Sequence, residues 1–163
     1  MNSSIRALAL GTVLLASAAA AQDRAGEVPG LLVTLKSEKA AERAGSARTL
    51  GEIGPPAKDA VPDLGAALKD SDKEVRRSAA QALGDIGPAS APTASALAAA
   101  LKDADWQVRR AAAYSLGRLG TREVEPALKT ARNDKQEAVR KAAKASLDRI
   151  KKLPKPQKMK TMK

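Results

Sequence analysis

The sequence contains one segment twice, and the two copies start 33 residues apart. Residues 68–87 read LKDSDKEVRRSAAQALGDIG and residues 101–120 read LKDADWQVRRAAAYSLGRLG, with 12 identical positions. The same shift backwards recovers Leu35, Arg43, Leu50, Gly51, Ile53, Gly54 and Pro55. A shift of 31 residues forwards recovers Leu128, Asp134, Val139, Arg140, Ala143 and Leu147. A period of this length predicts stacked repeats, here four units near residues 27–57, 58–90, 91–120 and 121–152.

Each unit has the pattern of two helices. In the second unit, Leu64 and Leu68 are four residues apart, as on one face of a first helix. A second helix is indicated by the helical spacing of Val75, Ala79, Ala82, Leu83 and Ile86. Asp72 stands at the N-cap position of this second helix, and Gly87-Pro88 ends it. Because two short amphipathic helices cannot bury their apolar faces alone, the units must stack, and the predicted fold is all-α.

The composition allows only a thin core and excludes several kinds of site. Aromatic residues make up 1% of the chain, with no Phe, one Trp and one Tyr. Closely packed helices rich in Ala and Leu suit such a core better than a β-sandwich. The absence of Cys and His removes the usual ligands of zinc, copper and haem, together with the usual catalytic dyads and triads. We therefore predict no metal, no cofactor and no enzymatic activity.

The first 21 residues have the pattern of a secretory signal peptide. Arg6 precedes the apolar stretch Ala7–Ala19, and small residues continue up to Ala21. This stretch is shorter than the roughly 20 apolar residues that a membrane-spanning helix needs, which favours cleavage over anchoring. We expect an exported bacterial protein, periplasmic or secreted, with no transmembrane segment in the mature chain.

The C-terminus is a concentrated cation. Residues 151–163 carry six Lys and no acidic residue, out of a net charge of +11 for the whole chain. Pro154 and Pro156 interrupt this polar segment, so residues 153–163 are predicted to be a disordered basic tail. Two interpretations stay open: the tail is a solubilising end, or it attaches to anionic lipid, cell-wall polymer or nucleic acid.

The repeated motif L-K-D-x-D-x-x-V-R-R-x-A-A-x-x-L-G-x-x-G resembles the HEAT repeat, in the Ala-rich form of the phycobilisome lyase type. The resemblance covers approximately residues 27–152, within a repeat domain of residues 22–152, and implies a right-handed α–α superhelix of about four helix pairs. It also implies a ladder of hydrogen bonds between stacked turns, formed by Asp70, Arg76, Asp103, Arg109, Asp134 and Arg140. Because Ser37 occupies the Asp position of the first unit, Arg43 is expected to need another partner. In the last unit, Arg132 replaces a Leu, as expected of a solvent-facing end.

The polar side of the second helices carries the predicted binding residues. In solenoids of the family that the sequence resembles, the second helices line the concave face, so their polar residues should form one ridge. The predicted partner-binding residues are Arg48, Arg77, Gln81, Arg110, Tyr114, Arg118 and Lys141. Tyr114 favours a binding surface over an ordinary solvated face, because an aromatic ring among polar residues is a typical contact anchor.

Two other features have structural interpretations that outweigh functional ones. The pairs Asp70/Asp72 and Asp103/Asp105 lack the further oxygen ligands of a calcium loop, so we interpret them as turn and cap residues. Trp106 opens the second helix of the third unit, and we expect it to cover the inter-helix turn rather than to bind a partner.

These features predict a scaffold that binds a macromolecule, with a protein as the leading hypothesis. Binding of an anionic polymer through the basic ridge and the Lys-rich tail is a second hypothesis. Binding of nucleic acid in this way is disfavoured by the leader and by the scarcity of aromatic residues. A third hypothesis, a chromophore lyase-like subunit, rests on the type of repeat alone. The leader disfavours it, because such lyases act in the cytosol.

Overall fold

The computed structural model describes residues 24–154. In this range the chain forms eight α-helices and no β-strand. The helices are α2 (Val28–Thr34), α3 (Ala40–Ile53), α4 (Val61–Ala67), α5 (Lys73–Ile86), α6 (Ala94–Ala100), α7 (Trp106–Leu119), α8 (Glu125–Ala131) and α9 (Glu137–Lys152). Short 3-10 helices precede each pair, at Arg24–Glu27, Pro55–Ala60, Gly87–Thr93 and Arg122–Val124. The predicted signal peptide and residues 155–163 of the predicted tail lie outside the described residues.

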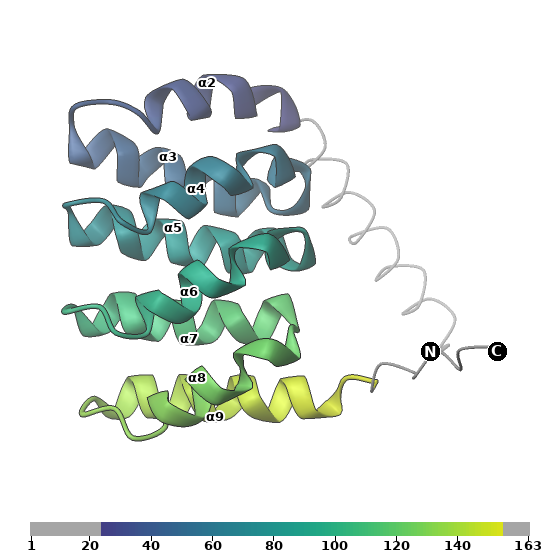
Figure 1. Cartoon of the computed structure of the whole chain (residues 1–163). Coiled ribbons are helices and arrows are strands. Elements are labelled where there is room, and N and C mark those ends of the chain that lie inside the picture. The colour runs from purple at the N-terminus through teal and green to yellow at the C-terminus, as the bar shows by residue number, and fades with distance from the viewer. Residues whose placement is uncertain (1–23, 155–163) are drawn as a thin grey trace, which may run out of the picture.

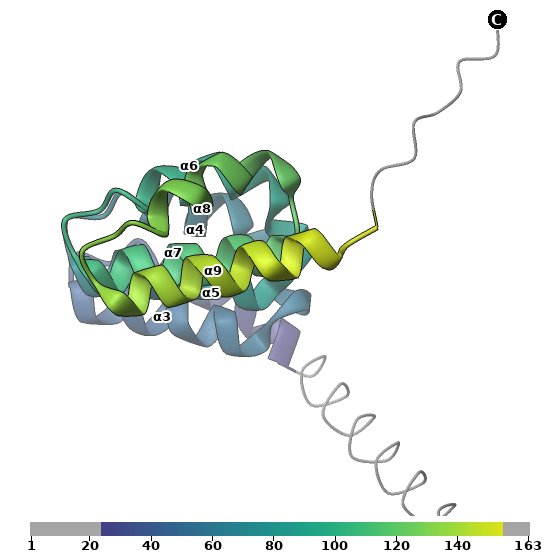
Figure 2. The same ribbon diagram turned by 90° about the horizontal axis from the view of Figure 1, so that it is seen from below.

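The helices stack as consecutive antiparallel pairs (Figure 1). The short helices α2, α4, α6 and α8 form one layer, and the long helices α3, α5, α7 and α9 form the other (Figure 2). The path from each short helix to its long helix and on to the next pair turns in a right-handed sense (Figure 1). The predicted all-α, right-handed superhelix of four helix pairs is therefore confirmed.

The same turn residues begin and end the long helices of successive units. Asp72 and Asp105 cap α5 and α7, because each side chain accepts hydrogen bonds from two backbone N–H groups of the first turn. At the other end, Gly87 follows α5 with a φ of 81° and Gly120 follows α7 with a φ of 73°, a conformation that favours glycine. The predicted cap at Asp72 and the predicted helix end at Gly87 are confirmed.

The core lies between the two layers and consists of small and branched aliphatic side chains. Its largest fully buried members are Leu50, Ile53, Leu64, Leu83, Ile86, Leu97, Leu116, Leu128, Ile150, Val75, Val108 and Val139. Burial of one such side chain contributes about 1.5–3 kcal/mol before ordering costs are subtracted. Each unit contributes only a few of them, so the free energy of folding depends on stacking between units.

The long helices approach one another at a glycine in each of three units. A Cβ atom added to Gly117 would lie 2.4 Å from Oγ and 2.8 Å from Cα of Ser146, which is closer than real Cβ atoms come. The two other close pairs are Gly84 with Ser115 and Gly51 with Ala82. A side chain at any of these glycines would force the stacked helices apart.

Two buried serines join the long helices where the glycines bring them together. The Ser115 hydroxyl donates to the carbonyl of Ala80 at 2.6 Å, and the Ser146 hydroxyl donates to the carbonyl of Ala113 at 2.8 Å. Each bond crosses from one unit to the preceding one. The long-helix layer is therefore held both by packing and by hydrogen bonds between units.

Candidate protein-binding face

A ladder of Arg–Asp pairs joins the turns that connect the short and long helices. The Nε and Nη2 atoms of Arg43 donate to both carboxylate oxygens of Asp70, at 2.7 and 2.8 Å. The next rungs are Arg76 with Asp103 at 2.7 and 3.0 Å and Arg109 with Asp134 at 2.7 and 3.0 Å. The Nη1 atom of each arginine donates to two backbone carbonyls of its own turn. Each arginine thus ties its own turn to the carboxylate of the following one.

Each closed rung joins an arginine to the aspartate of the following unit, and this direction gives Arg43 a carboxylate partner. Arg43 pairs with Asp70, so the expectation that Ser37 leaves Arg43 without its ladder partner is wrong. The carboxylate comes from the following unit, and within the described residues the unit of α8 and α9 is followed by no other. Within residues 24–154, Arg140 donates to two backbone carbonyls of its own turn and to no carboxylate.

The ladder keeps its carboxylates ionised. The pKa of Asp70 lies below its usual range, chiefly because Arg43 donates hydrogen bonds to it, and the pKa of Asp134 is lowered in the same way by Arg109. Burial acts most strongly on Asp103 and would raise its pKa, but hydrogen bonds from Arg76 and from a backbone N–H outweigh burial and lower it. The three Asp–Arg pairs therefore remain charged throughout the neutral range.

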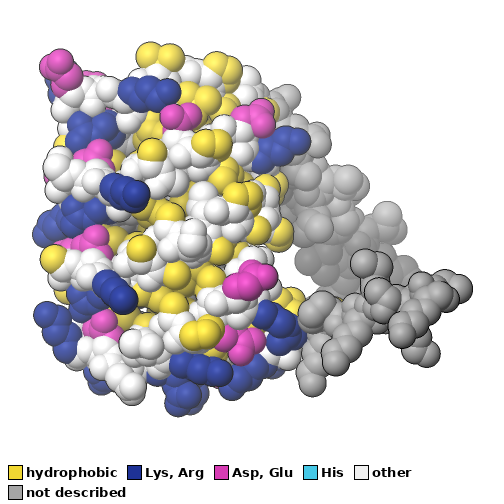
Figure 3. All heavy atoms as spheres, viewed as in Figure 1, with side chains coloured by type: hydrophobic (Ala, Val, Ile, Leu, Met, Phe, Trp, Pro, Cys, Tyr) yellow, Lys and Arg dark blue, Asp and Glu magenta, His cyan; other side chains and the backbone are white. Residues whose placement is uncertain are grey.

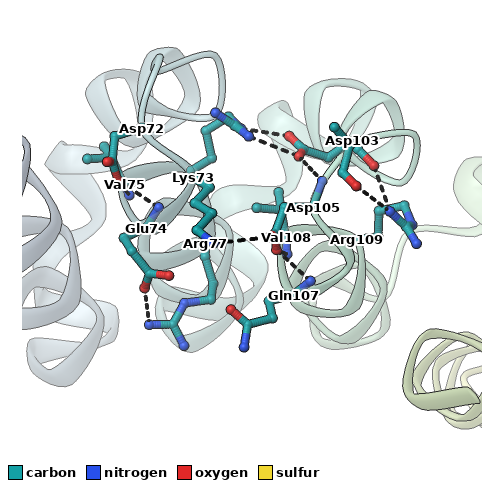
Figure 4. A network of polar contacts seen from close by, with 12 residues as sticks. Asp72, Lys73, Glu74, Val75, Arg77, Asp103, Asp105, Gln107, Val108 and Arg109 are labelled. Atoms are coloured by element: carbon teal, nitrogen blue, oxygen red, sulfur yellow. Dashed lines mark hydrogen bonds and ion pairs between the residues drawn. The ribbon is translucent and has the colours of Figure 1, made fainter. Parts of the chain in front are cut away.

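The adjacent Asp pairs have structural roles in each turn. Figure 4 shows Asp103 and Asp105 side by side: Asp103 accepts from the backbone N–H of Asp105 at 2.8 Å, and Asp105 caps α7. Lys73 of the preceding unit lies 3.8 Å from the Asp105 carboxylate. No group of three or more acidic residues that could hold a metal ion occurs in residues 24–154. Within the same residues, no helix is long and apolar enough to cross a bilayer.

The outward surface of α3, α5, α7 and α9, here called the long-helix face, carries all seven predicted partner-binding residues. They line three adjoining grooves. The first, of about 340 Å³ between α3 and α5, includes Arg48, Arg77 and Gln81. The central one, of about 500 Å³ across α5, α7 and α9, includes Arg77, Gln81, Arg110, Tyr114 and Lys141. The third, of about 300 Å³ between α7 and α9, includes Tyr114 and Arg118.

The floor of the central groove was not among the predicted residues. It is formed by Ala111 of α7 and by Ala138 and Ala142 of α9. Sequence reasoning followed the polar side of each helix, so it passed over these small apolar residues. Their helical spacing in α9, at positions 138 and 142, is the signal that would have indicated an apolar strip beside Lys141.

Tyr114 and Arg118 form the best-defined cluster of this face. The Arg118 Nε atom donates to the carbonyl of Gly84 at 2.7 Å, which anchors the side chain across two units. Its guanidinium donates to the Tyr114 hydroxyl at 3.2 Å and lies 5.8 Å from the ring centroid. Asp85 is 3.9 Å from Arg118, and its pKa is raised because burial outweighs the attraction of that arginine. Tyr114 as a whole residue is 46% exposed, so an aromatic side chain held by Arg118 faces solvent.

The charge of the long-helix face changes along the solenoid. On α3 and α5, cations and acids alternate, in the set Arg48, Glu52, Glu74, Arg77 and Asp85. On α7 and α9, cations outnumber acids, with Arg110, Arg118, Lys141, Arg149 and Lys152 against Glu137 and Asp148. Among the described residues, Arg48, Arg110 and Arg149 have no ion-pair partner. The C-terminal half of this face is therefore the more basic one.

The opposite surface, formed by the short helices, lacks such a cluster. Figure 3 shows hydrophobic side chains scattered over its middle, with Lys and Arg along the edge of the inter-helix turns and at the C-terminal end. A groove of about 560 Å³ between α6 and α8 has a mixed lining of apolar and polar residues, namely Ala98, Leu101, Pro126, Ala127 and Ala131 with Lys102, Thr130, Asn133 and Asp134. Trp106, the first residue of α7, is 37% exposed, and its predicted role as a cover of the turn stays a prediction.

Solved structures with similar folds include both natural and designed repeat proteins. A chain in the complex of CpcE and CpcF of phycocyanin lyase from Nostoc sp. is 29% identical, with a TM-score of 0.65 over 82% of this chain and 88% of that chain. Human deoxyhypusine hydroxylase is 26% identical, with a TM-score of 0.61 over 76% of this chain and 43% of that enzyme. A designed armadillo repeat protein, at 19% identity and a TM-score of 0.66, shares the fold over 77% of this chain and 64% of its own length.

Comparison at the level of sequence families gives the assignment. No curated protein sequence matches the chain. The family model described as HEAT repeats matches twice, at residues 28–94 and 93–161, and so spans most of the chain. The stacked helix pairs and the fold shared with phycocyanin lyase agree with this match. The chain belongs to the HEAT-repeat family.

Proposed function

We propose that the chain is an exported HEAT-repeat scaffold that binds a protein partner through the long-helix face, the face that is concave in solenoids of this family. The observation that carries the proposal is the gathering of Tyr114, Arg77, Arg110 and Lys141 around one apolar-floored groove. Aromatic and arginine side chains around a small apolar centre are the composition that protein interfaces use for their strongest contacts. Export rests on the leader pattern of residues 1–21.

The side chains around the central groove are preorganised for binding. Arg118 holds the Tyr114 ring from one side, so little side-chain freedom is lost when the ring is covered. The Arg77 Nε–H is buried without an acceptor among the described residues, although Nη2 pairs with Glu74. Rotation of Arg77 toward a partner therefore gives up little beyond that exposed pair. The glycine contacts and serine hydrogen bonds keep the long helices, and with them the groove, in fixed register.

Arginines hold the ladder acids and approach the one acid that lines the central groove. The ladder carboxylates are bound by Arg43, Arg76 and Arg109 at the inter-helix turns, and Asp85 of the central groove is 3.9 Å from Arg118. The structure of CpcE with CpcF supports a protein as the partner, because there a chain with this fold forms a complex with another protein. The basic C-terminal half of the face also suits an anionic polymer, which the experiment below separates from a protein.

The test removes the predicted anchors and measures capture of a partner. The triple variant Arg77→Ala, Arg110→Ala, Tyr114→Ala of the chain from residue 22 is used as bait with the envelope fraction of the native host. We expect the affinity for the captured protein to fall at least about 30-fold, because loss of a hot-spot residue costs 2 kcal/mol or more. Affinity is measured by surface plasmon resonance with the purified partner.

A matched control removes the same kinds of side chain elsewhere. The variant Lys69→Ala, Lys102→Ala, Trp106→Ala also removes two cations and one exposed aromatic, and it should keep the wild-type affinity. Equal losses in both triple variants, with unchanged melting, would contradict the assignment of the face. The capture is repeated with the cytosolic fraction, and a ligand found only there would contradict export. Binding to duplex DNA that falls steeply with salt would indicate that the ligand is a polyanion and not a protein.

A further inference from the structure

The last rung of the ladder is open. Arg140 Nη1 donates to the carbonyls of Asp134 and Lys135 at 2.8 and 3.0 Å, which is the anchoring that Nη1 has in the other three rungs. In those rungs Nε and Nη2 donate side by side to a carboxylate of the following unit. Among residues 24–154, the Nε and Nη2 atoms of Arg140 have no acceptor. The same donor fork is therefore built once more, with no residue of the described range in the carboxylate position.

The position of the missing carboxylate is defined by the three closed rungs. In each of them the Nε–Oδ2 distance is 2.7 Å and the Nη2–Oδ1 distance lies between 2.8 and 3.0 Å. Because backbone carbonyls hold the Arg140 guanidinium, the fork loses little freedom when a carboxylate binds. A bidentate pair with a guanidinium is also among the stronger hydrogen-bonded contacts that a protein surface offers.

The surroundings favour an acidic ligand. A shallow pocket of about 170 Å³ at the same end of the solenoid is lined by Arg132, Lys144, Lys151, Leu147 and a single acid, Asp148. Lys144 lies one helical turn after Arg140 on α9, so the two cations share one side of the helix. Figure 3 shows Lys and Arg side chains gathered at this end of the molecule. Glu137, which also interacts electrostatically with Arg140, is paired with Lys141, so cations outnumber acids around the fork.

The occupant is not a further helical repeat. Lys144 and Asp148 stand where the preceding unit has Ala113 and Gly117, the small residues that let long helices approach. A second copy of this chain stacked end to end in the register of the repeats would not supply the carboxylate either, because the first unit has Ser37 in the position of the ladder aspartate. The outward side of α9 is therefore unsuited to pack against a further long helix. It keeps Arg140, the arginine that corresponds to those that bind a carboxylate in the other rungs.

We propose that the C-terminal end of the solenoid is a second docking surface, which takes an acidic segment of a partner protein. One carboxylate of that segment accepts hydrogen bonds from Nε and Nη2 of Arg140, as the ladder aspartates do within the chain. Arg132, Lys144 and Lys151 attract the neighbouring acids of the segment. This surface is separate from the long-helix face, and it stands whether or not that face binds a partner.

Nuclear magnetic resonance provides the test, because the Arg140 Nε–H signal reports on the fork itself. The chain from residue 22 is titrated with a blocked hexa-aspartate peptide, with its hexa-asparagine counterpart and with inorganic phosphate. We expect saturable shifts of the Arg140 Nε–H and of the backbone amides of the first turns of α9 with hexa-aspartate alone. In Arg140→Lys, which keeps the charge but not the fork, the affinity read from those amides should fall about tenfold, as expected for lost charge-assisted hydrogen bonds.

Controls separate the fork from general charge. Lys144→Ala should weaken peptide binding about threefold, since it removes a neighbouring cation. Lys58→Ala, in the 3-10 helix before α4 and two units away from α9, should not change it. The Nε–H signals of Arg43, Arg76 and Arg109 verify folding in every variant. Hexa-aspartate binding that leaves the Arg140 signal unmoved, or that survives Arg140→Lys unchanged, would overturn the proposal. Phosphate binding as strong as that of the peptide would do the same, because it would indicate a small-anion site.

Discussion

Replacing Arg109 by alanine is expected to lower the free energy of unfolding by about 3–5 kcal/mol, because it leaves a buried carboxylate without its partner. The Arg109 and Asp134 side chains are only 6% and 10% exposed, and their pair crosses from the third unit to the fourth. The substitution also frees the carbonyls of Asp103 and Ala104. Chemical denaturation followed by circular dichroism measures the loss.

Arg140→Ala is the matched control for this prediction. Arg140 makes the same two carbonyl hydrogen bonds but reaches no carboxylate within the described residues. Its removal should cost about 1–2 kcal/mol, so the difference between the two variants isolates the bridge between units. Equal losses in both variants would show that the arginines act only within their own turns.

Gly117→Ala is expected to lower the free energy of unfolding by about 2–3 kcal/mol, although alanine favours helices more than glycine does. The added Cβ would lie 2.8 Å from the Cα atom of Ser146, and a backbone atom cannot rotate away. The loss is again measured by urea denaturation, with the free energy of unfolding extrapolated to water. Gly117→Ala combined with Ser146→Gly should recover part of the loss, because the two clashes with the serine side chain disappear.

Gly45→Ala isolates the contact from the helix propensity. Gly45 lies inside α3, and a Cβ built there meets no atom within 4 Å. This substitution should therefore stabilise the protein by about 0.5–1 kcal/mol. A destabilisation of similar size at Gly45 and Gly117 would mean that close approach of the long helices is not what these glycines provide.

The repeat, the helix pairs and their ends follow from the sequence because each depends on local residues. The spacing of Val75 and Leu83 defines one face of α5, Asp72 caps its start, and Gly87 ends it with a positive φ. These are interactions within one unit, which a periodic pattern displays directly. The family resemblance added the sense of the superhelix, which local pattern alone does not determine.

The direction of the ladder could not be predicted from spacing. Asp70 precedes Arg76 by six residues in its own unit, whereas it follows Arg43 by 27 residues, and both arrangements repeat with the same period. In the structure Arg76 binds the backbone carbonyl of Asp70, and Arg43 binds its carboxylate. A period reveals which residues recur, but it does not reveal which neighbour each copy contacts.

The residues of the candidate site could be predicted from helical spacing, but the groove that they line could not. Helical spacing placed Arg77, Arg110 and Tyr114 on one side of their helices, and the structure brings them into one groove. The groove itself depends on how far apart the stacked helices lie. That distance is determined by contacts such as Gly84 with Ser115, in which the glycine and the serine belong to different units.

The central claim, that a protein partner sits on the long-helix face, is tested most directly by site-specific photo-cross-linking. A benzophenone amino acid is placed at position 114, in the central groove, and separately at position 127, in the groove between the short helices α6 and α8. The chain is then illuminated with its captured partner and analysed by mass spectrometry. Our account predicts a cross-link from position 114 and none from position 127. A cross-link from position 127 alone would contradict it.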